Sequence, residues 1–242
     1  MNTLLKPLQV RETLLQKKVR TFTTHDFENI FRTTPTKTTY FLETQTAEGL
    51  FIRLKRGVYA LKTDLPSQEE IANSLYRPSY ISFEYALAYC GVMPEMPYTV
   101  TSATTKPTRH ITANNMSFAY YSIKEEAYTG YASIHTIRRI SLKGKDVNLY
   151  ETALTGSSMG YFLIAEPEKA LVDYLYFVAL GKRMENDRLY IEPGTVDEVK
   201  AHTYARLYNK KKLEGATGRP HMIANDALAA LRTKYHTTEL NV

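Results

Sequence analysis

The sequence contains a single cysteine, Cys90, and no tryptophan among its 242 residues. One thiol cannot form an internal disulfide and leaves no cysteine cluster for zinc. The chain also lacks a run of about 20 apolar residues, the length needed to span a bilayer. Residues 1–20 are interrupted by charges and by Pro7, unlike a secretory signal peptide. We therefore expect a protein of the reducing cytoplasm that does not interact with a membrane.

Patterns typical of catalytic or cofactor sites are also missing. The six histidines are scattered without the spacing of metal ligands, and no glycine pattern of a nucleotide-binding loop is present. Residues 156–160 satisfy G-x-S-x-G, but the strand-like residues 161–164 follow where a hydrolase elbow requires a helix. We expect no catalytic residue, no cofactor and no metal.

Positive charge is unevenly distributed along the chain. Residues 1–62 contain 11 lysines and arginines against 5 acidic residues, whereas residues 63–242 contain 20 of each sign. The whole net charge of +6 therefore belongs to the first quarter of the sequence. A basic segment attracts phosphates, so this asymmetry favours a nucleic-acid partner.

Residues 50–61 predict a β-hairpin with a cationic tip. Two apolar runs flank Arg56 and Gly57, and glycine adopts the positive φ of a tight turn at little cost. The first run alternates, with Phe51, Arg53 and Lys55 on one face and Leu50, Ile52 and Leu54 on the other. Period-two alternation is typical of a half-buried strand.

Three helices are expected before this hairpin. The first spans residues 3–19, the second follows a capping-box pattern of Thr23 and Asp26, and the third runs from Pro35 to about Ala47. Helices followed by such a hairpin indicate a winged helix-turn-helix, which we assign to residues 1–65, with the third helix as recognition helix.

The residues that we expect to contact DNA have hydroxyl, aromatic or cationic side chains. They are Thr36, Lys37, Thr39, Tyr40 and Thr44 of the third helix and Arg53, Lys55 and Arg56 of the hairpin. Thr38, Phe41 and Leu42 should face the core instead.

Residues 66–242 predict a larger mixed domain, which makes the fold class α+β. Strand-like runs occur at residues 98–104, 117–123, 134–142 and 161–165, and helices are expected at residues 83–90, 167–180, 196–208 and 222–235. The strands come in runs and do not strictly alternate with helices, as in α+β folds.

Four segments together resemble the AbiEi family of type IV toxin–antitoxin antitoxins, which act as transcriptional regulators. They are residues 54–61 (LKRGVYAL), 80–91 (YISFEYALAYCG), 98–102 (YTVTS) and 167–173 (PEKALVD). The resemblance covers about residues 10–181 and implies a winged-helix repressor that binds the operator upstream of its own gene. It also implies a second domain that antagonises a nucleotidyltransferase-fold toxin, with or without direct contact. Residues 182–242 show no family pattern and are interpreted as a helical extension.

Two alternative functions stay open. Glu166, Glu168 and Asp173 could serve a metal-dependent nucleic-acid-processing enzyme, because such enzymes gather carboxylates around cations. Glu168 in a first helical turn and Lys169 paired with Asp173 favour a structural role instead. In the other alternative, the basic face binds an acidic protein, and the chain is an interaction module that does not bind DNA.

Overall fold

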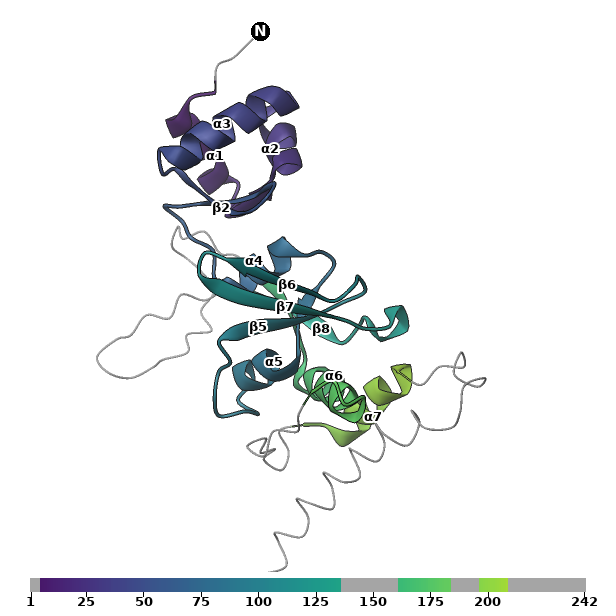
Figure 1. Ribbon diagram of the computed structural model, residues 1–242. Helices are drawn as coiled ribbons and strands as arrows, with labels where there is room; N and C mark the ends of the chain where they lie inside the picture. The colour runs from purple at the N-terminus through teal and green to yellow at the C-terminus, as the bar shows by residue number, and fades with distance from the viewer. Residues whose placement is uncertain (1–4, 136–160, 184–195, 209–242) are drawn as a thin grey trace, which may run out of the picture. The chain divides into compact units, whose positions relative to one another are not determined.

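A computed structural model describes residues 5–135, 161–183 and 196–208 (Figure 1). Its described part is mixed α+β, with seven α-helices, a short 3-10 helix and two β-sheets, as the sequence predicted. Contacts divide the chain into two compact units, the first built mainly on residues 5–77 and the second mainly on residues 78–132 and 163–208.

The helices of the first unit begin where local capping signals stand. α1 (Pro7–Gln16) has its proline at the first helical position and is shorter than the predicted 3–19. α2 (Thr24–Phe31) has the predicted capping box, in which the Thr23 hydroxyl accepts from the Asp26 amide and Asp26 accepts from the Thr23 amide. α3 spans Pro35–Ala47 as expected.

A three-stranded antiparallel sheet completes this unit. Its strands β1 (Thr21–Thr23), β2 (Phe51–Lys55) and β3 (Val58–Leu61) lie in the order β1-β3-β2. Aromatic rings of Phe22, Phe27 and Phe51 pack together at centroid distances of 5.4–6.5 Å. Residues of α1 and α3 close the same core, so burial of apolar surface holds the three helices on the sheet.

α4 (Gln68–Leu75) also belongs to the first unit; its Ile71, Ala72 and Leu75 are buried, and it makes polar contacts with residues before and within β1. The Arg20 guanidinium lies 2.8 Å from a Glu70 carboxylate oxygen, and the hydroxyls of Thr21 and Ser74 are 2.7 Å apart. Burial raises the pKa of Glu70, although the Ser67 amide and Arg20 act in the opposite direction.

The second unit is built on a six-stranded mixed sheet in the order β6-β7-β5-β4-β9-β8. Its strands are β4 (Tyr80–Ile81), β5 (Thr99–Thr104), β6 (Arg109–Ala113), β7 (Met116–Ser122), β8 (Tyr131–His135) and β9 (Tyr161–Ala165). β4 runs antiparallel to β5 and parallel to β9, while β5 and β7 are parallel. The sequence predicted β5, β7 and β9 to within a residue or two but did not predict β6.

Three helices and a short 3-10 helix accompany this sheet. They are α5 (Phe83–Tyr89), η1 (Glu125–Ala127), α6 (Pro167–Ala179) and α7 (Glu198–Leu207). α6 packs against both α5 and α7, and the three helices gather together below the strands in Figure 1. The predicted helix at residues 222–235, most of the predicted strand at 134–142 and the G-x-S-x-G segment lie outside the described residues.

A buried polar network connects four elements of the second unit. The Asp173 carboxylate on α6 accepts hydrogen bonds from Tyr80 at 3.0 Å, Ser82 at 2.7 Å, Tyr208 and the ammonium of Lys169. Lys169 and Asp173 are fully buried. Burial lowers the pKa of Lys169, and Asp173 partly offsets this effect.

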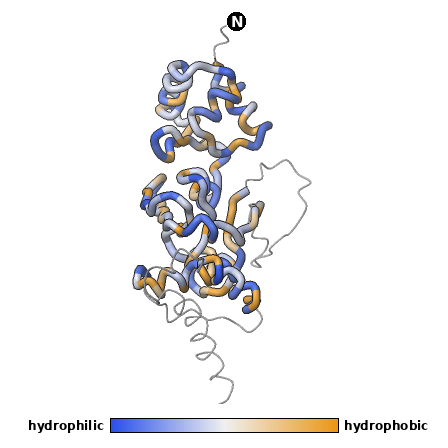
Figure 2. Tube along the Cα trace, turned by 90° about the vertical axis from the view of Figure 1, so that its right-hand side faces the viewer, coloured by the Kyte–Doolittle hydropathy of each residue, from blue (hydrophilic) through white to orange (hydrophobic). Residues whose placement is uncertain are grey.

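No helix within the described ranges is both long and apolar enough to cross a bilayer. Figure 2 agrees, since hydrophilic and hydrophobic residues alternate over short distances along the coloured trace.

We predict that Asp173→Ala lowers the free energy of unfolding by about 3–5 kcal/mol, because it leaves the Lys169 ammonium buried without its counter-ion. Urea denaturation followed by circular dichroism and tyrosine fluorescence measures this. The double variant Lys169→Met/Asp173→Asn removes both charges but keeps a carbonyl acceptor, so it should lose clearly less. Glu198→Ala, an exposed carboxylate on α7, is the matched control. An equal loss of unfolding free energy in Asp173→Ala and Glu198→Ala would contradict a special role for the buried Lys169–Asp173 pair.

Candidate nucleic-acid interface

The inner face of α3 packs into the core of the first unit. Thr38, Leu42 and Gln45 are buried at i, i+4 and i+7, and Phe41 is half-buried with its ring 6.5 Å from that of Phe51. The predicted core positions Thr38, Phe41 and Leu42 are therefore confirmed. The Gln45 amide donates to a Glu48 carboxylate oxygen at 2.6 Å, which satisfies a polar group at an inward position.

The outer face of α3 presents the predicted helix residues to solvent. Thr36, Lys37, Thr39 and Tyr40 are exposed, and Tyr40 retains 74% of its accessible surface. Thr44 is half-buried, so it lies at the edge of this face.

The start of α3 suits an anionic ligand. The Thr34 hydroxyl makes no capping hydrogen bond, and Pro35 occupies the first position. The amide groups of a first helical turn and the helix dipole favour phosphate. The Lys37 ammonium adds a positive charge in that turn.

The hairpin has the predicted turn but not the predicted alternation. Lys55 pairs with Val58 across Arg56 and Gly57, and Gly57 has a φ of +75°. The register shifts between Arg53 and Lys55, which marks a β-bulge. Phe51 and Leu54 are consequently both buried, although alternation would place them on opposite faces.

The three cations of the hairpin differ in their exposure to solvent. Arg53 and Arg56 are exposed. Lys55 is half-buried, and its ammonium donates to the Leu75 carbonyl at the end of α4. A cation at a helix C-terminus complements the helix dipole, so Lys55 connects the hairpin to α4 within the same unit.

The carboxylates of the alternative enzyme site have partners inside the second unit. Glu166 accepts from the Tyr204 hydroxyl at 2.5 Å and from Lys200 at 2.9 Å, and these bonds lower its pKa. Glu168 accepts from the Asp197 amide at 3.2 Å, and Asp173 lies in the buried network. Within the described ranges, no cluster of three potential metal ligands occurs.

No protein-family model and no curated protein sequence matches the chain.

Sequence reasoning missed the role of α4 and the partner of Lys55. The Ser67–Glu70 capping box of α4 is readable from the sequence, but the contact between Lys55 and Leu75 joins residues 20 positions apart. No local pattern marks such a pair.

We predict that the hairpin cations differ in their effect on stability. Lys55→Ala should lower the free energy of unfolding by about 1.5 kcal/mol, the lower end of the range for a hydrogen bond that involves a charged group, because the Lys55 side chain is only half-buried. Arg53→Ala and Arg56→Ala should change it by no more than about 0.5 kcal/mol, as exposed positions do. Denaturant titration of the three single variants tests this order. A larger loss in Arg56→Ala than in Lys55→Ala would contradict the assignment.

Proposed function

We propose that the first unit is a winged helix-turn-helix that binds duplex DNA, with α3 in the major groove and the β2–β3 hairpin as the wing. The chain order of helix, strand, two helices and hairpin supports this topology, as does the sheet order β1-β3-β2. In this arrangement a recognition helix contacts base edges and flanking elements contact the backbone.

The observation that carries the proposal is the exposed polar face of α3 on the unit that contains residues 1–62, the segment with a net charge of +6. Thr36, Thr39 and Tyr40 offer groups that can read base edges, and Lys37 offers a phosphate contact. Arg53 and Arg56 provide exposed guanidinium groups on the hairpin, suited to phosphates or to the minor groove. Lys55 joins the hairpin to α4, because its ammonium donates a hydrogen bond to the Leu75 carbonyl.

The biological role that we propose is autoregulation in the cytoplasm. The protein would repress its own operon and act as antitoxin to a nucleotidyltransferase-fold toxin encoded beside it. This part rests on the resemblance of residues 54–61, 80–91, 98–102 and 167–173 to the antitoxin family. Co-expression with the adjacent gene product tests it, because an antitoxin restores growth that the toxin arrests.

The metal-dependent enzyme is less well supported than DNA binding. A two-metal site needs carboxylate oxygens open to cations and substrate. The Asp173 carboxylate is fully buried and already accepts from four donors. Cleavage of plasmid or RNA with Mg²⁺ or Mn²⁺ that disappears in Glu168→Ala would reverse this preference.

We predict that the double variant Arg53→Ala/Arg56→Ala binds all duplexes more weakly. Each lost phosphate contact lowers the salt slope of log K by about one, so the double variant should lose about two. Electrophoretic shift titrations at several salt concentrations, on the DNA upstream of the gene, measure this slope. Arg206→Ala, an exposed arginine of the second unit, is the control and should leave it unchanged. Failure of the wild type to shift any duplex would favour the interaction module.

We predict a different result for Tyr40→Ala. If Tyr40 contacts base edges, its loss should reduce the ratio of operator to random-DNA affinity about 10- to 100-fold, the value of one to two base contacts. The salt slope should stay the same, because no phosphate contact is removed. Tyr98→Ala removes an exposed tyrosine of the second unit and should change neither quantity. If Tyr40→Ala weakened binding to operator and to random DNA equally, this would contradict a base contact by Tyr40.

A further inference from the structure

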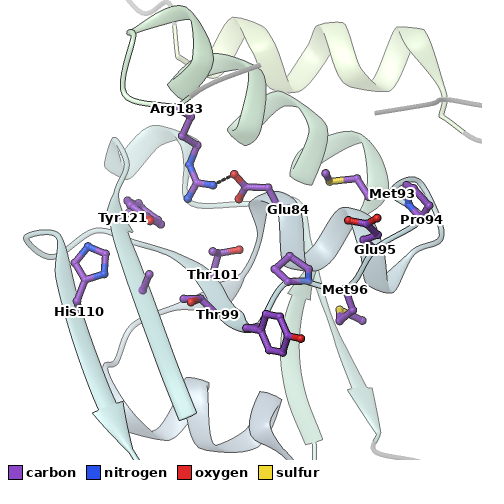
Figure 3. A pocket seen from close by; sticks show the side chains of 13 residues that line it. Glu84, Met93, Pro94, Glu95, Met96, Thr99, Thr101, His110, Tyr121 and Arg183 are labelled. Carbon is purple, nitrogen blue, oxygen red and sulfur yellow. Dashed lines mark ion pairs between the residues drawn. The ribbon is translucent and has the colours of Figure 1, made fainter. Parts of the chain in front are cut away.

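The second unit contains a cavity of about 540 Å³ that the proposed DNA binding does not use (Figure 3). It lies between the start of α5, the loop at residues 93–98 and strands β5, β6 and β7. Its size falls in the range of small-molecule sites, which are mostly apolar with a few placed polar groups. Met93, Met96, Pro97 and Tyr98 form an apolar part of its lining.

Arg183 provides the main charged group of this cavity. Its guanidinium carbon lies 4.6 Å from the Phe83 ring centre and 4.3 Å from that of Tyr121. One terminal nitrogen, Nη1, pairs with a Glu84 carboxylate oxygen. Figure 3 shows the side chain pointing into the space between Tyr121 and Glu84, above Thr101.

Two donors of Arg183 have no hydrogen-bond partner among the residues that the structure describes. The side chain is only 9% exposed, and both Nε and Nη2 are buried without a hydrogen bond. Burial lowers the pKa of Arg183 to about 10. Native proteins rarely leave a buried donor unpaired, because its lost hydration is not replaced. The pair of unpartnered atoms therefore requires an explanation.

The identity of these two atoms indicates the ligand. Nε and Nη2 stand on the same edge of the planar guanidinium, and their parallel N–H groups match the two oxygens of a carboxylate or a phosphate. The charges of the lining select between them. The carboxylates of Glu84 and Glu95 line the cavity together with Arg183 and His110, so a phosphate dianion would meet more repulsion from them than a carboxylate would.

The backbone beneath the site is held in an unusual conformation. Phe83 has a φ of +60°, in the left-handed region that a bulky side chain rarely adopts. This conformation places the Phe83 ring against Arg183 and starts α5 so that Glu84 reaches Nη1. The surrounding structure thus supports the position of the guanidinium from two sides.

We propose that this cavity binds a small monocarboxylate with an apolar body. The carboxylate accepts from Nε and Nη2 of Arg183, and the body lies against the Met96 and Tyr98 side chains. Both are accessible, since Tyr98 is fully exposed and Met96 is 49% exposed.

Ligand-observed NMR and calorimetry on the full chain at pH 7 test this, with benzoate, phenylacetate and hexanoate as probes. We expect one of the three acids to bind with a dissociation constant of about 1 mM or tighter. Its neutral amide should bind at least about tenfold more weakly, because it cannot take both N–H groups as an anion does. Absence of binding by all three acids up to about 10 mM, or equal affinity of acid and amide, would overturn the proposal.

Two variants locate the binding in the cavity. Arg183→Lys keeps the positive charge but removes the two parallel N–H groups of Nε and Nη2, so the affinity for the acid should fall about tenfold or more. Arg206→Lys is the matched control and should bind as the wild type does. Tyr98→Ala changes an exposed side chain outside the core and should also weaken binding, because it removes a surface against which the body of the acid lies. It therefore tests the site even where Arg183→Lys is poorly folded, and an unchanged affinity in a folded variant of either residue would contradict the site.

Discussion

The second unit depends on the burial of one carboxylate among four donors. The Asp173 carboxylate accepts hydrogen bonds from four side chains. They are Tyr80 of β4, Ser82 just before α5, Lys169 of the same helix and Tyr208 at the end of α7. Removing charge from water is costly, so the network is stable only when all of these elements are in place. Ser82 directly precedes Phe83, and the network therefore also fixes the strained start of α5 on which the Arg183–Glu84 pair is built.

The first unit is held together in a different way. Its interior is a cluster of phenylalanine rings and aliphatic side chains, and ionic contacts such as that of Arg20 with Glu70 serve to attach α4. Because the core uses the inner face of α3, Thr36, Lys37, Thr39 and Tyr40 of the outer face are exposed. The separation of apolar and polar faces is what leaves a helix surface available to a partner.

Local signals made much of this structure predictable. The capping box of Thr23, the helix that begins at Pro35 and the turn at Gly57 each depend on residues a few positions apart, and the structure confirms all three. The sequence also placed Ser82 before a helix, but its hydroxyl bonds Asp173, 91 residues away, and does not cap that helix. Long-range partners have no periodicity, which is why the buried network, the Lys55 contact and the Arg183 cavity escaped sequence reasoning.

The tyrosines of the two units differ in burial and in the contacts that they make. Tyr80 and Tyr208 are buried, and their hydroxyls satisfy Asp173 while their rings lie 5.6 and 5.0 Å from the Lys169 ammonium. Tyr40 and Tyr98 are the two most exposed tyrosines of the described residues. Neither ring gains the benefit of burial within its own unit. One stands on the proposed reading face of α3 and the other at the rim of the cavity, where binding would supply the contact that the fold does not.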